Sequence, residues 1–115
     1  MLPERPRARR YTFPANIELM NVESETKIRA HTCDLNLFGC HVKTMSPWTV
    51  GTKVRLKITY KGAAFVAAGR VAHVRGDEGM GVRFTDVGVK DELILERWIA
   101  ELREQVGEHP TVHIP

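Results

Sequence analysis

Apolar and polar residues alternate along most of the chain up to residue 84, and a period of two is typical of β-strands with one buried face. The alternation is cleanest in KVRLKITY, Lys53 to Tyr60. Gly69 is expected to kink the longest predicted strand, Ala63 to Val74, because glycine inside a strand often marks a bend or bulge. The other five predicted strands are Phe13 to Met20, Thr26 to Cys33, Gly39 to Thr44, Ala63 to Val74 and Met80 to Phe84.

After residue 88 the apolar residues recur at the spacing of an α-helix. Between Val89 and Val106 they fall at positions 95, 98, 99, 102 and 106, and Gly107 follows where helices commonly end. Six short strands and one helix predict an all-β fold, a six-stranded antiparallel β-barrel with a C-terminal α-helix over an open end or side. The predicted division is an arginine-rich arm at 1–12, the barrel and helix at 13–106, and a tail at 107–115.

The positive charge of the chain is concentrated at its N-terminus. The net charge of +3 comes from 17 basic and 14 acidic residues. The first ten residues, MLPERPRARR, contain four arginines and one glutamate, which leaves 13 basic and 13 acidic side chains in the remainder. A guanidinium group holds phosphate through two hydrogen bonds and pairs with the O6 and N7 atoms of guanine. The arm is therefore either a solvated tail or an element that binds phosphate or guanine.

Several other classes of protein find no support in the sequence. The longest strictly apolar run, Ala63 to Ala68, is too short to span a membrane, and no apolar signal-peptide segment follows the arginines. Two cysteines do not make a disulfide framework, so we expect a cytoplasmic protein without membrane insertion. No motif supports a Ser/His/Asp or Cys/His catalytic set, so we expect no enzyme activity and no cofactor.

The segment HTCDLNLFGCHVKT, residues 31–44, contains four side chains that can bind zinc: His31, Cys33, Cys40 and His41. Adjacent residues of a strand point to opposite faces, so all four converge only if the second strand is broken. The C-x₂₋₄-C spacing of common zinc sites is also missing. We therefore expect free thiols and no metal site.

The centre of that segment, DLNLFG at residues 34–39, joins two predicted strands. Asp34, Asn36 and Gly39 suit a simple hairpin turn, but the three apolar residues among them are unusual for one. The alternative is a loop that presents Asp34 and Asn36 outward while its apolar residues anchor it to the barrel. Gly39 would then let another group approach the backbone closely.

Two segments together resemble the signature of the PilZ domain family. Arg5 and Arg9 have the spacing R-x-x-x-R, and DLNLFG matches [D/N]-x-S-x-x-G in all but one defined position. GMGVRFTDV, Gly79 to Val87, is similar to the last strand of the family, and LILERWIAEL to its C-terminal helix. The resemblance spans roughly residues 5 to 105 and implies a split β-barrel that binds the bacterial second messenger cyclic diguanylate (c-di-GMP). The ligand-binding residues that it implies are Arg5, Arg9, Arg10, Asp34, Asn36 and Gly39.

The chain departs from the family pattern at two places. Asn36 stands where serine is usual. In many relatives the second arginine directly precedes the first strand, which would select Arg10, and the position four residues before it is Pro6. The spacing favours Arg5 and Arg9 as the working pair, with Arg10 contributing mainly long-range charge.

The resemblance implies a stand-alone c-di-GMP receptor that signals to an unidentified protein effector, as in bacterial motility or biofilm regulation. The alternative is a PilZ-like adaptor that binds a protein partner and no nucleotide. A barrel that binds single-stranded nucleic acid ranks last, because 7% of residues are aromatic and the body is charge-neutral.

Overall fold

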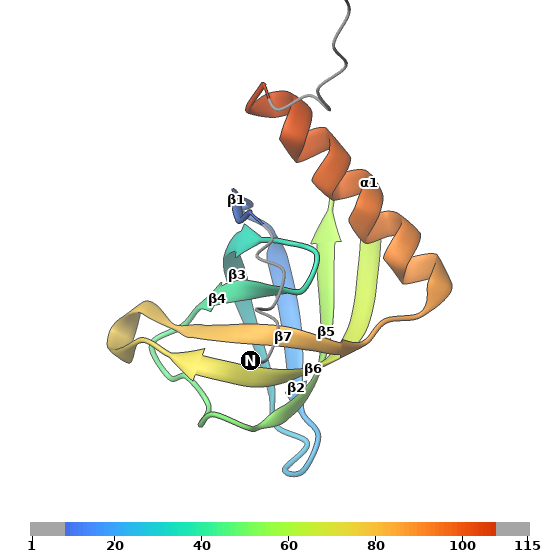
Figure 1. Ribbon diagram of the computed structural model, residues 1–115. Coiled ribbons are helices and arrows are strands. Elements are labelled where there is room, and N and C mark those ends of the chain that lie inside the picture. Colours follow the sequence, from blue (N-terminus) through green and yellow to red (C-terminus); the bar gives the residue numbers. More distant parts are fainter. Residues whose placement is uncertain (1–8, 108–115) are drawn as a thin grey trace, which may run out of the picture.

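The computed structural model describes residues 9–107, so Arg5, most of the predicted arm and nearly all of the predicted tail lie outside the described residues. The described chain forms a barrel of strands with one long helix at its C-terminal end (Figure 1). In order, the elements are β1 (Tyr11–Thr12), β2 (Asn16–Asn21), β3 (Lys27–Leu35), β4 (Gly39–Lys43), β5 (Lys53–Tyr60), β6 (Ala63–Val74), the 3₁₀ turn η1 (Gly76–Glu78), β7 (Met80–Asp86) and α1 (Val89–Gln105).

The sheet confirms the predicted fold and adds one strand to it. Strands β3, β2, β5, β6, β7 and β4 pair in that order, and β4 pairs back onto β3, which closes an antiparallel barrel. The extra strand β1 pairs with the end of β3. It has two residues, too few for a hydrophobic period to reveal.

Strand β2 begins at Asn16 and not at Phe13, where the sequence predicted its start. Pro14 interrupts the pairing, and the Thr32 hydroxyl fills the gap by accepting a hydrogen bond from the Ala15 amide (3.0 Å) and donating one to the Phe13 carbonyl (2.5 Å). Buried backbone groups need such partners. The bridge ties the segment before β2 firmly to β3.

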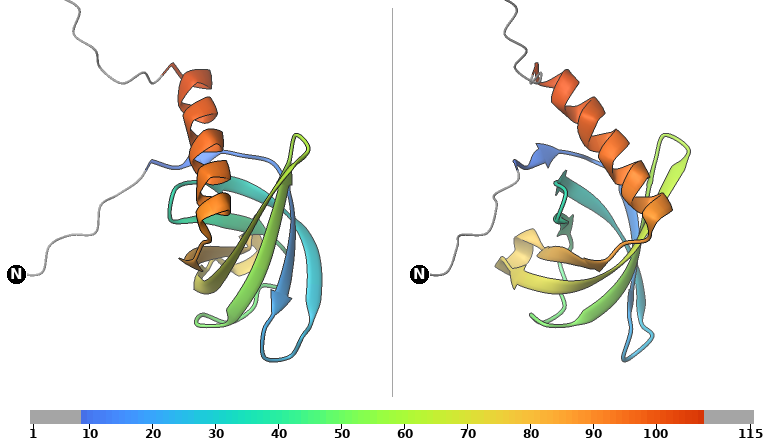
Figure 2. Two further views of the ribbon diagram at one scale, coloured as in Figure 1. Left: turned by 90° about the vertical axis from the view of Figure 1, so that its right-hand side faces the viewer. Right: turned by 45° about the vertical axis from the view of Figure 1, so that its right-hand side comes forward.

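The barrel interior is filled by the alternate residues that the sequence predicted. Val54, Leu56 and Ile58 of β5 are buried. Helix α1 lies at one end of the barrel, where it contacts β6 and β1 (Figure 2). Its buried residues, Leu95, Trp98, Ile99 and Leu102, match the predicted helical positions, whereas Val106 follows the last turn and is exposed.

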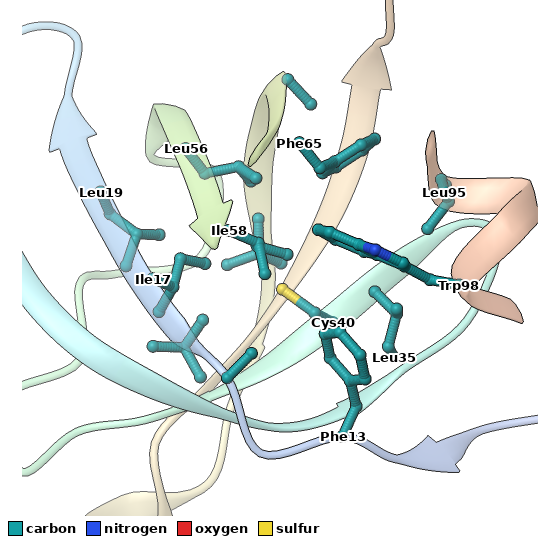
Figure 3. Close-up of a cluster of buried hydrophobic side chains, with 14 of the residues drawn as sticks. Phe13, Ile17, Leu19, Leu35, Cys40, Leu56, Ile58, Phe65, Leu95 and Trp98 are labelled. Atoms are coloured by element: carbon teal, nitrogen blue, oxygen red, sulfur yellow. The ribbon is translucent and has the colours of Figure 1, made fainter. Parts of the chain in front are cut away.

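An aromatic cluster joins the helix to the barrel. Trp98 packs against Phe13, Tyr60 and Phe65, with ring centroids 5.5, 5.8 and 6.2 Å away. Figure 3 shows the Trp98 ring entering the same apolar interior as Phe65 and Ile58. Such aromatic pairs add to the free energy gained by burying apolar area. Within residues 9–107, no helix combines the length and the apolar character needed to cross a membrane.

Candidate functional site

Strand β1 brings the arm to the DLNLFG loop. Tyr11 pairs with Leu35 and Thr12 pairs with Asp34, so the chain enters the barrel beside the first two residues of the loop. Arg9 and Arg10 directly precede this strand. A segment that is remote in sequence is thereby fixed next to the candidate carboxylate.

The two described arginines of the arm have different surroundings. The guanidinium carbon of Arg9 lies 5.5 Å from the centroid of the Tyr11 ring, in the geometry of a cation–π contact. Arg10 lies close enough to His73 of β6 for its charge to lower the pKa of that imidazole. Arg10 therefore places its positive charge on the side of the loop where β6 and β7 lie.

Asn36 holds the DLNLFG loop in shape. Its side-chain oxygen accepts hydrogen bonds from the amides of Phe38 (2.7 Å) and Gly39 (3.0 Å), and its own amide donates to the Gly39 carbonyl (2.9 Å). This is the backbone-mimicking turn that asparagine favours. The side-chain oxygen of Asn36 is thus used within the loop, and the outward presentation of Asn36 to a ligand stays a prediction.

Asp34 and Leu35 connect the loop to the sheet. The Oδ1 atom of Asp34 accepts a hydrogen bond from the His41 amide (3.1 Å), and Leu35 is fully buried in the barrel. Leu37 and Phe38 are 37% and 47% exposed, so the prediction that the apolar residues anchor the loop is correct for Leu35 and wrong for these two. Only Leu35 still belongs to β3 and faces the core, whereas the other two lie beyond the end of the strand.

Gly39 is required by the close approach of β7. A Cβ atom at this position would lie 2.2 Å from the Val82 carbonyl oxygen. The φ angle of Gly39 is not among the positive ones, so left-handed backbone is not the reason for glycine here. The group that approaches the Gly39 backbone is another strand of the protein.

Two histidines flank Gly81 on the side of the barrel wall that faces away from the core, where His41 is buried and His73 is half-buried. Gly81 of β7 pairs with His41 of β4 on one side and with His73 of β6 on the other. The two imidazoles are nearly parallel, 25° apart, with centroids separated by 6.0 Å. A Cβ on residue 81 would lie 2.1 Å from Cε1 of His73, so only glycine leaves room for this ring.

Electrostatics and hydrogen bonding set the two histidines apart. Burial lowers the pKa of His73, and the charges of Arg10 and Arg75 lower it further, while the Asp34 carboxylate opposes them. Within the described part of the chain, Nε2 of His73 is a buried nitrogen without a hydrogen-bond partner. By contrast, Nε2 of His41 donates to the Glu78 carbonyl (3.1 Å), since a carbonyl can only accept.

Two arginines lie on the same side of the barrel wall as these histidines. Arg70 and Arg83 are exposed and pair with each other across β6 and β7, and Arg83 also pairs with Gly39. We call the set Arg10, His41, Arg70, His73 and Arg83 the outer basic face. The charge-neutral barrel thus gathers three arginines, Arg10, Arg70 and Arg83, next to the loop, which suits an anionic ligand.

Comparison with known proteins identifies the family. The family model of the PilZ domain matches residues 4–101. This chain belongs to the PilZ domain family. No curated protein matches its sequence.

Solved PilZ structures share the fold. The PilZ domain of CeSA from a cellulose-synthesising bacterium superposes with a TM-score of 0.68 at 20% identity, covering 83% of this chain and 98% of that one. The PilZ domain of Escherichia coli YcgR, solved with c-di-GMP, has a TM-score of 0.68 at 18% identity, covering 91% and 96%. Bacillus subtilis MotI/DgrA, an inhibitor of motility, has a TM-score of 0.71 at 16% identity, covering 94% of this chain and 55% of that one.

The cysteines of this PilZ domain lie in different environments. Cys40 is buried in the barrel, where its sulfur points among apolar side chains and burial raises the pKa of the thiol (Figure 3). Its neighbour His41 belongs to the outer basic face, so the two residues point to opposite faces as predicted. Cys33 is half-buried at a register shift between Thr32 and Asp34. The described residues include no group of three or more potential ligands arranged around a metal site.

Sequence reasoning missed the histidine pair of the PilZ domain. Val71 and Val82 are buried partners, and a register shift between Val71 and His73 turns His73 outward. The strict period of two would have placed His73 inside with Val71. A histidine at an inward position, opposite the glycines of the segment GMG, was the available signal.

Proposed function

We propose that this PilZ domain is a receptor for c-di-GMP, which binds where the arm, the DLNLFG loop and the outer basic face meet. The observation that carries the proposal is the pairing of Thr12 with Asp34, because Arg9 and Arg10 directly precede this pair and so enter the barrel beside the loop. The fold is also that of the YcgR domain solved with c-di-GMP.

The chemistry of the ligand suits these groups. c-di-GMP carries two phosphates and two guanines, and both accept hydrogen bonds from arginine. We assign the phosphates and guanine edges to Arg5 and Arg9, with Arg10 as an additional cation. The Asp34 carboxylate accepts hydrogen bonds from guanine N1–H and N2–H₂ or orients an arginine.

Asn36 and Gly39 contribute through the shape of the loop. The Asn36 oxygen fixes the backbone between Phe38 and Gly39, and a serine hydroxyl can make the same kind of turn less strongly. We therefore expect the replacement of the usual serine by asparagine to preserve this turn of the loop. The Gly39 amide donates a hydrogen bond to the Asn36 oxygen. Because Gly39 has no side chain, β4 can lie close against β7 at this position.

We propose that the receptor passes its signal to a protein effector. Leu37 and Phe38 lie at the tip of the loop and are exposed next to the proposed ligand. We propose that they contact the effector, since exposed apolar side chains beside polar ones are common at interfaces. The same pair supports the second candidate function, an adaptor that binds its partner without nucleotide.

Isothermal titration calorimetry at micromolar protein tests the receptor. We expect saturable binding of c-di-GMP and no comparable binding of linear GMP. Asp34→Ala should weaken binding strongly. The control variant Arg55→Ala, which removes an exposed charge from β5, should not change it. Absence of heat and of any rise in melting temperature with c-di-GMP would reject the receptor and leave the adaptor.

A further inference from the structure

His41, Gly81 and His73 lie side by side on strands β4, β7 and β6, and two features of this arrangement are unfavourable for stability. A bulge in β6 turns His73 out of the core, and Gly81 forgoes a side chain to make room for its ring. Nε2 of His73 is buried and has no hydrogen-bond partner among residues 9–107, although most buried polar atoms in proteins have one. A bound group that forms a hydrogen bond with this nitrogen would supply the missing partner.

Most of the titratable groups that face His73 disfavour its protonated form. They come from the residue before β1 (Arg10), from β3 (Asp34), from β4 (His41) and from the segment after β6 (Arg75). Strand β7 contributes the uncharged Gly81, and η1 contributes the Glu78 carbonyl that holds His41. Only Asp34 among these favours a protonated His73.

We propose that His73 is a contact residue of the c-di-GMP site and takes up a proton when the ligand binds. The inference rests on the receptor function proposed above. An anionic phosphate brought to the outer basic face offsets the repulsion by Arg10 and Arg75, and it offers an acceptor to a protonated Nε2. Neutral His73 in the free domain and charged His73 in the complex are the two states that follow.

The sign of the pH dependence follows from this difference. In the free domain the pKa of His73 lies below its ordinary value of 6.5, and binding raises it. Between the two pKa values a proton enters with the ligand, so the affinity rises as pH falls, by at most about tenfold per pH unit for one proton. Below the pKa of the free domain both states are charged, and the affinity no longer changes.

Calorimetry in two buffers of different ionisation enthalpy measures the proton uptake directly. We expect the wild type to bind c-di-GMP about three- to tenfold more tightly at pH 6.0 than at pH 7.5, with net proton uptake between these values. His73→Gln should still bind but lose both effects. The matched variant His31→Gln, which removes an exposed imidazole of β3, should keep them.

A second measurement needs no mutation, in case His73→Gln does not fold. Titration of the His73 ring proton by NMR should show a higher pKa in the complex than in the free domain. Binding without proton uptake, or an unchanged ring pKa, overturns the role of His73 while the receptor stands. Absence of c-di-GMP binding at every pH overturns the receptor itself, and the inference falls with it.

Discussion

The two sides of the barrel differ in the regularity of their strand pairing. The pairings of β2 with β3, of β2 with β5 and of β5 with β6 run without a register shift. The pairing of β3 with β4 contains one shift and that of β6 with β7 contains two. The irregular side carries Asp34 and the outer basic face, and its bulges turn Asp34 and His73 away from the core, where a regular ladder would bury them.

From this difference we expect the residues that determine the stability of the domain to lie on one side of the barrel and those that bind the ligand on the other. The regular side buries alternate residues such as Ile17, Leu56 and Ile58 and exposes ordinary solvated charges. On the irregular side, side chains that a regular strand would bury face away from the core, where we propose that the ligand binds. We therefore expect changes in the core to alter unfolding, and changes around the loop to alter binding first.

The largest expected effect on stability comes from Phe65→Ala. Phe65 is fully buried and contacts Phe84 and Trp98, so its truncation should lower the free energy of unfolding by about 3–5 kcal/mol. Urea denaturation followed by circular dichroism measures the loss. Thr59→Ala, at an exposed position of β5, is the control and should change it by less than about 0.5 kcal/mol. A loss below that of an ordinary surface change would show that the core is not packed as described.

The largest expected effect on binding comes from Arg9→Ala. A direct arginine–phosphate contact removed from a site commonly costs about 2–5 kcal/mol, so binding at micromolar c-di-GMP should become unmeasurable. Arg10→Ala should weaken binding less and mostly at low salt, because a screened charge is worth less than about 1 kcal/mol. Calorimetry at two salt concentrations separates the two. The reverse order of the variants would make Arg10 the second arginine of the motif.

Gly39→Ala should affect stability and binding together. The added methyl group would collide with the Val82 carbonyl, and overpacking of this kind typically costs about 1–3 kcal/mol. Thermal denaturation measures the cost, with Gly88→Ala as the control, since a Cβ there meets nothing closer than 3.5 Å. Equal melting temperatures for the two variants would mean that β4 and β7 separate easily at the loop.

The smallest expected effect distinguishes the two roles of Asn36. Asn36→Ala removes the acceptor of the Phe38 and Gly39 amides and should cost about 0.5–1.5 kcal/mol of stability. Asn36→Ser should recover part of this stability and leave c-di-GMP binding close to that of the wild type. If serine and alanine weaken binding equally, the asparagine side chain contacts the ligand directly.

The contrast between the two sides also explains what the sequence could predict. Lys53 to Tyr60 and Ala63 to Val74 were predicted with the bounds that the structure has, because regular alternation depends on each strand alone. A register shift also lies beside Gly69, where a kink was predicted. The outward turn of His73 was not predicted, because a bulge is defined by two residues facing one on a neighbouring strand.

The candidate site shows the same limit. The loop and the arm were found from their motifs, but their contact depends on the two-residue strand β1, which no periodicity reveals. The exposure of Leu37 and Phe38 and the steric need for Gly39 depend on where β7 passes. Features that arise between strands therefore had to come from the structure.

Titration of the ¹⁵N-labelled domain with c-di-GMP, followed by NMR of its backbone amides, tests the central claim most directly. We expect saturable shifts concentrated in residues 9–12, 34–41 and around His73 and Gly81, with β2 and β5 nearly unchanged. Absence of shifts, or shifts centred on α1 and β5, would contradict the claim that the irregular side of the barrel is the nucleotide site.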